Sequence, residues 1–165
     1  MAIIINSKDE SVVATTEDNY ITSLSALNIP CEEEGTGDWH FRNHYFPNEN
    51  GMPAQILAGK DHLSTKEWLG NEGIYDCYSI LKEWGVDVKP RKIYAANHYR
   101  AVVDMVFHYL KSGANIKKTI SLNDWLPEAH EKQRIYQLLD RLKPAFSEDE
   151  WLIIEEWKEY TYPPD

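Results

Sequence analysis

The sequence lacks long hydrophobic runs and has few cysteines, and both absences narrow its class. No stretch approaches the roughly 18 consecutive apolar residues that span a membrane, and no basic residues precede the N-terminal apolar run as they do in a signal peptide. Only two cysteines are present, Cys31 and Cys77, too few for a disulfide framework. We therefore expect a cytoplasmic protein with two reduced thiols and no membrane association.

Motifs for nucleophilic catalysis and for cofactor binding are also missing. The chain contains neither G-x-S-x-G nor C-x-x-C, and it contains neither the G-x-G-x-x-G loop nor a Walker motif. We therefore expect no cofactor. Active sites can also assemble from residues distant in sequence, so these absences favour a non-enzymatic protein without excluding catalysis.

Basic residues are scarce: 17 Lys and Arg stand against 27 Asp and Glu, for a net charge of −10. The balance is uneven, because segment 86–120 holds seven basic and two acidic residues while segments 1–85 and 121–165 are both acidic. An acidic chain repels the phosphate backbone, which disfavours direct binding of nucleic acid, and it attracts basic protein surfaces. Solubility alone is the competing interpretation, since net charge is a weak predictor of a partner.

The hydrophobic pattern changes character along the chain, from short strand-like runs to helices. Strand signals lie within residues 1–96, together with helical spacing at 17–27 and 74–84, and about three helices follow in residues 97–161. We expect an α+β fold in which a small mixed or antiparallel sheet packs against helices. A length of 165 residues suits a single domain spanning 1–165.

The clearest amphipathic helix lies in the stretch 94–113. Apolar side chains recur there at helical spacing, at Val102, Val103, Val106, Phe107 and Leu110. Asn97 is a suitable N-cap, and Gly113 can supply the left-handed residue that ends the helix. This stretch is expected to organise the fold.

The strongest helix start lies near the C-terminus. Ser147 and Glu150 have the spacing of a capping box, and Phe146 and Trp151 stand where a hydrophobic staple requires them. The pattern predicts a helix that runs to about Tyr160.

The first candidate ligand residues lie in the segment 39–46. Aromatic residues alternate there with His40, Arg42 and His44, so a strand would carry these three on one cationic face that could hold a phosphate or carboxylate. The competing interpretation is the solvated outer face of an edge strand. Four residues of a strand span roughly 13 Å, too far for one metal ion to join His40 and His44, so no metal site is expected.

The second candidate cluster is Asn97, His98 and Arg100, at a predicted strand-to-helix junction. Free N–H groups at a helix start attract anions, and Arg100 adds positive charge. The competing interpretation is an ordinary capped helix start. If both clusters converge, they form a ligand site of six residues: His40, Arg42, His44, Asn97, His98 and Arg100.

Two functional hypotheses follow. The first is a non-enzymatic acidic binding protein that engages and restrains a basic partner protein, as an inhibitor, immunity protein or antitoxin does. It rests on the acidity, on the six Trp and ten Tyr, and on the missing catalytic motifs, and it predicts exposed Trp or Tyr within an acidic patch. The second is a small enzyme or sensor that binds a phosphate-bearing ligand or nucleotide through the His and Arg residues. The sequence leaves a homo-oligomer open.

Overall fold

The computed structural model describes residues 12–30, 55–86, 88 and 91–162. Strands β1 (Ile74–Asp76) and β2 (Tyr94–Ala96) form a small antiparallel sheet in which Tyr75 pairs with Ala95. The helices are α1 (Ser23–Leu27), α3 (Lys66–Leu69), α4 (Tyr78–Glu83), α5 (His98–Lys111), α6 (Ile116–Thr119), α7 (Leu122–Trp125), α8 (Ala129–Arg141) and α9 (Glu148–Thr161), with the 3-10 helix η3 at Lys143–Ala145. The expected α+β class is confirmed.

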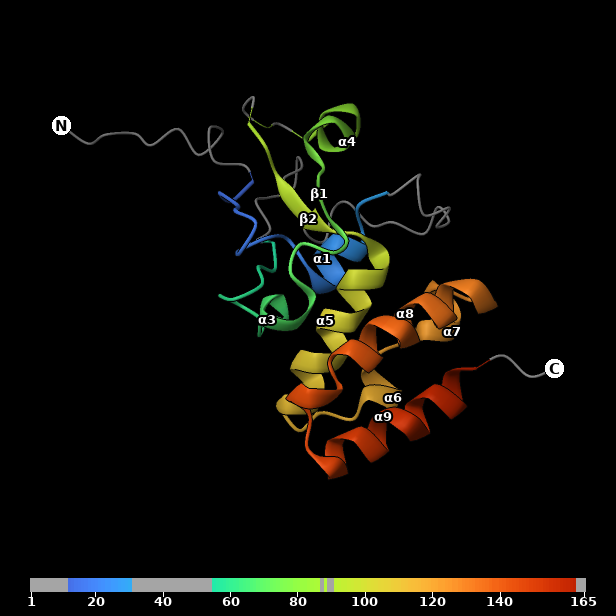
Figure 1. The fold of residues 1–165 in the computed structure, drawn as a ribbon. Coiled ribbons are helices and arrows are strands. Elements are labelled where there is room, and N and C mark those ends of the chain that lie inside the picture. Colours follow the sequence, from blue (N-terminus) through green and yellow to red (C-terminus); the bar gives the residue numbers. More distant parts are fainter. Residues whose placement is uncertain (1–11, 31–54, 87, 89–90, 163–165) are drawn as a thin grey trace.

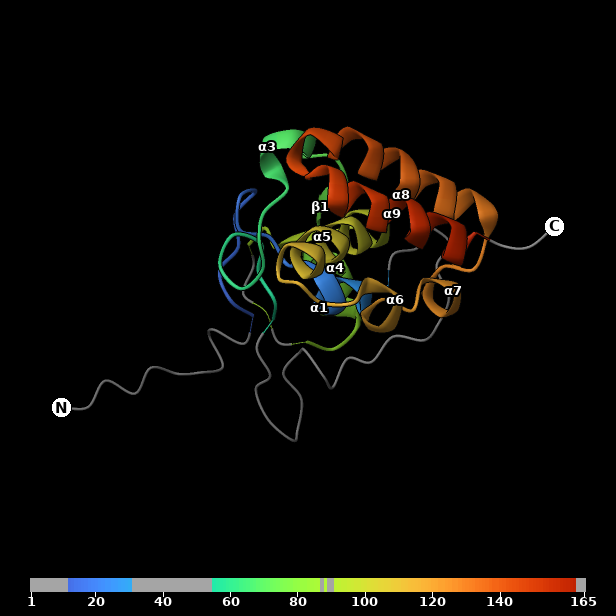
Figure 2. The ribbon, with the colours of Figure 1, turned by 90° about the horizontal axis from the view of Figure 1, so that it is seen from below.

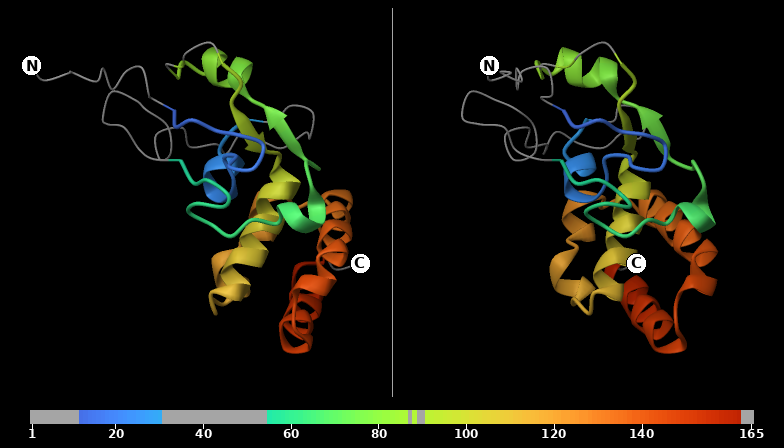
Figure 3. Two further views of the ribbon diagram at one scale, coloured as in Figure 1. Left: turned by 60° about the vertical axis from the view of Figure 1, so that its left-hand side comes forward. Right: turned by 90° about the vertical axis from the view of Figure 1, so that its left-hand side faces the viewer.

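Helix α5 passes through the middle of the molecule. Figures 1 and 2 show α1 on one side of α5, and α8 with α9 on the other, and α1 and α8 are the helices that pack most extensively against it. The two strands and α4 lie at one end of the molecule, and α9 lies at the opposite end (Figure 3). No helix among the described residues is long and apolar enough to cross a membrane.

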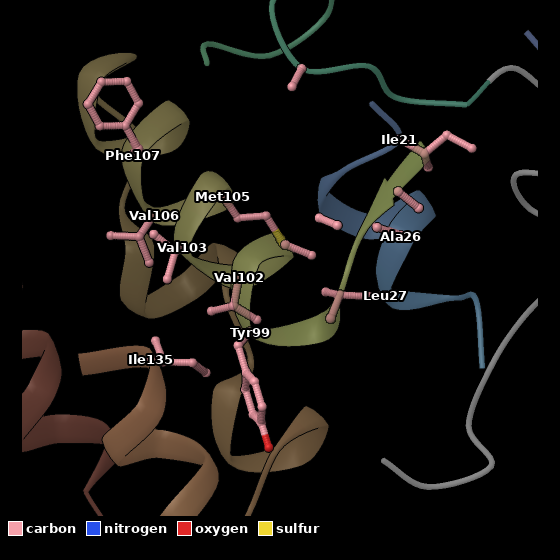
Figure 4. Packing of buried hydrophobic residues seen from close by; sticks show 14 of the residues in the cluster. Ile21, Ala26, Leu27, Tyr99, Val102, Val103, Met105, Val106, Phe107 and Ile135 are labelled. Carbon is pink, nitrogen blue, oxygen red and sulfur yellow. The ribbon is translucent and has the colours of Figure 1, made fainter. Parts of the chain in front are cut away.

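The predicted apolar stripe of α5 is buried, and the other faces of the helix are buried as well. Every residue from His98 to Phe107 lies in the interior. Figure 4 shows Met105 pointing toward Ile21 and Ala26, whereas Val102 lies on the side of Ile135 from α8. The helix is therefore covered on several sides by the rest of the chain.

The predicted ends of α5 and the predicted start of α9 are confirmed. The Asn97 side chain accepts a hydrogen bond from the Arg100 N–H at 2.9 Å, and Gly113 adopts a φ of +81° just beyond the helix. At the start of α9, Ser147 Oγ accepts from the Glu150 N–H at 3.1 Å while Glu150 Oε1 accepts from the Ser147 N–H at 2.8 Å. These reciprocal bonds satisfy N–H groups that the helix itself leaves unpaired.

The predicted helix 17–27 is wrong for its first half, because α1 begins only at Ser23. The preceding Ile21 instead forms isolated bridges with Leu57 and Ala95, and its N–H donates to the Tyr94 carbonyl at 2.9 Å. Helical spacing in the sequence does not reveal these distant backbone partners, and they determine the conformation at this point.

The predicted helix 74–84 is shorter as well. Residues Ile74–Asp76 form β1, and α4 begins at Tyr78. The side chain of Asp76, the last residue of β1, stabilises the junction with α4. Its Oδ1 accepts hydrogen bonds from the N–H groups of Tyr78 and Ile93, each at 3.0 Å. Cys77 between them is fully buried, and burial raises the pKa of its thiol to about 12, which suits an inert packing residue.

The inner side of α9 is attached to α8 by aromatic and polar contacts. The Trp157 ring meets the Tyr136 ring edge to face, with centroids 6.2 Å apart, and Tyr136 Oη lies 2.6 Å from Thr161 Oγ1. Lys132, almost fully buried, donates to the Thr161 carbonyl at 2.7 Å, so its ammonium group lies at the negative end of the α9 dipole. These contacts decide which side of α9 faces solvent.

Alanine variants of two glycines can test how closely the residue before β1 approaches the start of α5. A Cβ on Gly73 (φ +77°) would lie 2.8 Å from Asn97 Oδ1 and 2.9 Å from Arg100 Cβ, whereas one on Gly113 (φ +81°) would meet nothing within 4 Å. Both Ala variants suffer left-handed strain of about 1–2 kcal/mol, and only Gly73→Ala adds a clash. We expect urea denaturation to show a clearly larger loss of unfolding free energy for Gly73→Ala. Equal losses would contradict this close approach.

Candidate functional site

Half of the predicted ligand residues, His40, Arg42 and His44, lie outside the described residues. Their convergence with the second cluster therefore stays a prediction. Within the described parts of the chain, no group of three or more His, Cys, Asp or Glu side chains is arranged to hold a metal ion.

The other three predicted residues lie together at the start of α5, where Asn97 is half-buried and the other two are in the interior. Asn97 is the helix cap, as described above. His98 and Arg100 are fully buried, and His98 Nε2 lies 2.7 Å from the carbonyl oxygen of Ile29. All three thus make contacts within the chain, and the ligand hypothesis for them stays a prediction.

Asp104 is the centre of a buried polar network. Its carboxylate accepts hydrogen bonds from three hydroxyl groups: Tyr20 Oη at 2.7 Å, Thr22 Oγ1 at 2.6 Å and Thr65 Oγ1 at 2.6 Å. Burial, followed by the negative charge of Asp104, raises the pKa of Tyr20 well above its usual value, so Tyr20 remains a hydrogen-bond donor. The charge of Asp104 is therefore compensated by donors from two segments that are far from α5 in sequence.

Arg100, one helical turn before Asp104 on α5, belongs to the same network. Its Nε lies 3.3 Å from Asp104 Oδ1, and both side chains have 0 % exposure. Its Nη1 donates to the carbonyl oxygens of Gly70 at 3.1 Å and Glu72 at 2.5 Å, and its guanidinium carbon lies 5.4 Å from the centroid of the Tyr20 ring. This guanidinium binds groups of its own chain and presents no surface to a solute.

A pair of stacked imidazoles lies nearer the surface. The His62 and His108 rings are 3.9 Å apart and nearly parallel, at 6°. His62 Nδ1 lies 2.7 Å from Ser23 Oγ, and His108 Nδ1 accepts from the Leu63 N–H at 3.1 Å. Burial lowers the pKa of both histidines, and the neighbouring His108 lowers that of His62 further.

Ser23 and His62 have the spacing of a nucleophile and its general base, and Ser23 has a strained φ of +55°. The Ser23 side chain is fully buried, however, so a substrate has no access to its hydroxyl. The hydrogen bond between Ser23 and His62 therefore fits a structural role, in which it attaches the segment around His62 to α1 and α5. No pattern in the sequence predicts this contact.

The outer face of α9 is the most distinctive exposed surface. Four of the six large exposed hydrophobic residues in the described parts of the chain lie within residues 152–162, with Leu152 at 61 % and Tyr160 at 58 % exposure. The helix also carries six acidic residues and one basic residue. We call the following exposed set the outer face of α9: Asp149, Leu152, Ile153, Glu156, Glu159 and Tyr160.

A hollow of about 410 Å³ lies next to this face, where η3 leads into α9. Its lining consists of Lys143, Phe146, Ser147, Glu148, Trp151 and Leu152. The Phe146 ring contacts Trp151, with centroids 6.1 Å apart, and Phe107 of the core, at 5.5 Å. The hollow therefore has an aromatic wall that continues into the interior of the molecule.

Comparison with known proteins identifies no relative. No protein-family model, no curated protein and no solved structure matches this chain.

Variants of two aspartates, one buried and one exposed, can test the network around Asp104. Asp104→Ala would leave the buried Arg100 without its counter-charge and should lower the unfolding free energy by about 3–5 kcal/mol. Asp104→Asn, which keeps one acceptor oxygen, should lose less. In the control Asp140→Ala, only the ion pair between the exposed Asp140 and the partly exposed Lys158 is removed, so the loss should stay within about 1 kcal/mol. Chemical denaturation measures all three, and similar losses for Asp104→Ala and Asp140→Ala would refute the structural role of the network.

The stacked histidines predict a pH dependence of stability. Their pKa values are lowered from 6.5 in the folded protein, so below about pH 6.5 the unfolded chain binds more protons than the folded chain. The nearby Asp61 and Asp104 carboxylates act in the opposite direction on His62 without reversing the shift. Stability should therefore fall as pH decreases from 7.5 to 5.5.

Denaturation curves across this range should show a smaller slope for the double variant His62→Gln/His108→Gln. The control His130→Gln changes an exposed histidine on α8 and should keep the wild-type slope. A double variant with the wild-type slope would show that other groups cause the pH dependence.

Proposed function

We propose that this chain is a non-enzymatic binding protein that engages and restrains a basic partner protein, as an inhibitor, immunity protein or antitoxin does, and that the outer face of α9 makes the contact. The observation that carries the proposal is the clustering of exposed apolar side chains on a strongly acidic helix. Single exposed apolar residues are ordinary, and several of them on one face of a helix, set among charged residues, are what an interaction surface needs.

The two kinds of side chain on this face have different roles in binding. Leu152, Ile153 and Tyr160 offer apolar area, whose removal from water is worth about 25 cal/mol per Å² before the costs of association. Glu156 and Glu159 lie on the same side and supply the charge that attracts and orients a basic surface. Tyr160 is an exposed tyrosine on this face, and the ammonium group of Lys117 lies 5.4 Å from the centroid of its ring.

Charge also argues for a different protein, and against a second copy, as the occupant. Two copies meeting through the same face would bring the exposed carboxylates of both helices together, and like charges across an interface are costly. A basic partner reverses the sign of this interaction. We therefore expect a monomer in isolation and a 1:1 complex with the partner.

The test begins with capture of the partner from the source cell, followed by purification of that partner and kinetic measurements by surface plasmon resonance. The variant Glu156→Gln/Glu159→Gln removes two charges from the outer face. It should lower the association rate constant at least about threefold at low salt and weaken its dependence on ionic strength.

The matched control is Glu67→Gln/Glu83→Gln, which removes two exposed charges from α3 and α4 and leaves the net charge equal to that of the first variant. It should bind at nearly the wild-type rate. The proposal is refuted if the captured partner is acidic, or if the control slows association as much as the α9 variant does.

A further inference from the structure

The hollow beside the outer face of α9 has the properties of a pocket for one side chain of a protein partner. We propose that it receives an aliphatic or aromatic side chain of the basic partner, while Lys or Arg residues next to that side chain contact the carboxylates of α9. This inference rests on the proposed function and specifies which residue of the partner dominates binding.

The wall of the hollow is packed against the core of the molecule. Phe146 and Trp151 form it, and Phe146 packs on Phe107, which in turn packs on Trp68 at a centroid distance of 5.5 Å. This row of aromatic rings joins the surface to the core. Residues that dominate protein interfaces are most often Trp, Tyr or Arg, and they lie in well-packed pockets that exclude water.

The aromatic rings already interact with cations of their own chain. The ammonium groups of Lys143 and Lys158 lie 5.4 Å and 5.0 Å from the centroid of the Trp151 ring, and that of Lys111 lies 5.3 Å from the Phe146 centroid. A cation from the partner would have to displace them, whereas an apolar side chain can lie beside Leu152 and the ring edges. The occupant is therefore apolar, and its basic neighbours belong outside the hollow.

The location of the hollow favours a side chain over a small molecule. All six lining residues come from a single turn and the start of one helix, residues 143–152. Sites for small ligands enclose most of the ligand's surface and commonly lie between several elements. A hollow built from one turn covers one side of its occupant, and the remaining cover must come from the molecule that carries the occupant.

Two tryptophan variants separate the hollow from the rest of the face. Leu152→Trp keeps the apolar character and the charge but places an indole ring in the hollow. Ile153→Trp adds the same ring to the same face at a residue that does not line the hollow. Both side chains are exposed, so both variants should fold, and thermal unfolding checks this.

The probe is a library of displayed random peptides, selected for binding to the full chain. Enriched peptides should contain an apolar residue with Lys or Arg within a few positions. Synthetic copies should bind Leu152→Trp at least about tenfold more weakly than the wild type, and Ile153→Trp within about threefold. Peptides that bind both variants equally well, or a selection that enriches no binder, would overturn the assignment of the hollow.

The same measurements distinguish failure of this inference from failure of the proposed function. Enriched peptides without basic residues, whose binding is blocked by Leu152→Trp and insensitive to salt, would confirm an apolar pocket and contradict a basic partner. The opposite result is a basic peptide whose binding is sensitive to salt and is weakened by Glu156→Gln/Glu159→Gln but not by Leu152→Trp. That result would leave the acidic face as the binding surface and exclude the hollow.

Discussion

The buried ion pair of Arg100 and Asp104 is the interaction on which the arrangement around α5 depends. Charges removed from water are costly unless their hydrogen-bonding capacity is filled. Here hydroxyl groups from separate segments donate to the carboxylate and two carbonyl groups accept from Arg100 Nη1, while the buried Arg100 Nη2 has no hydrogen-bond partner among the described residues. Tyr20 and Thr22 come from the chain before α1, and Thr65 precedes α3. Because these hydrogen bonds form only when the segments are all in place, the segments are expected to order together.

Glu72 connects this network to the helical end of the molecule. Its carbonyl oxygen accepts from Arg100, while its carboxylate contacts Arg134 at 3.5 Å and Arg141 at 3.0 Å on α8. Exposed ion pairs of this kind contribute little individually, so the attachment of α8 depends chiefly on buried side chains such as Ile135. Because Arg100 is fully buried and donates to carbonyl groups of its own chain, its charge is not presented to solvent at the start of α5.

Local patterns predicted those parts of the structure that neighbouring residues determine. The Asn97 cap and the capping box at Ser147 depend on a few consecutive residues, and both are present. The prediction failed at Ile21 and at β1, where backbone bonds to distant segments replace helical ones, and a single sequence does not show which segments meet. Arg100 and Asp104 have the spacing of a surface helical pair, and only the complete fold reveals that both are buried.

The outer face of α9 could not be identified from its sequence for a related reason. Apolar residues occur on both sides of this helix, with Ile154 and Trp157 inside and Leu152 and Tyr160 outside, so periodicity alone does not tell which side is covered. The contacts with α8 decide it. The apolar side chains that stay exposed on α9 can still be buried against another molecule. Full burial of each large apolar side chain contributes about 1.5–3 kcal/mol. Charge distinguishes two possible occupants of this face, because the carboxylates of two copies facing each other would repel, whereas a basic surface would attract them.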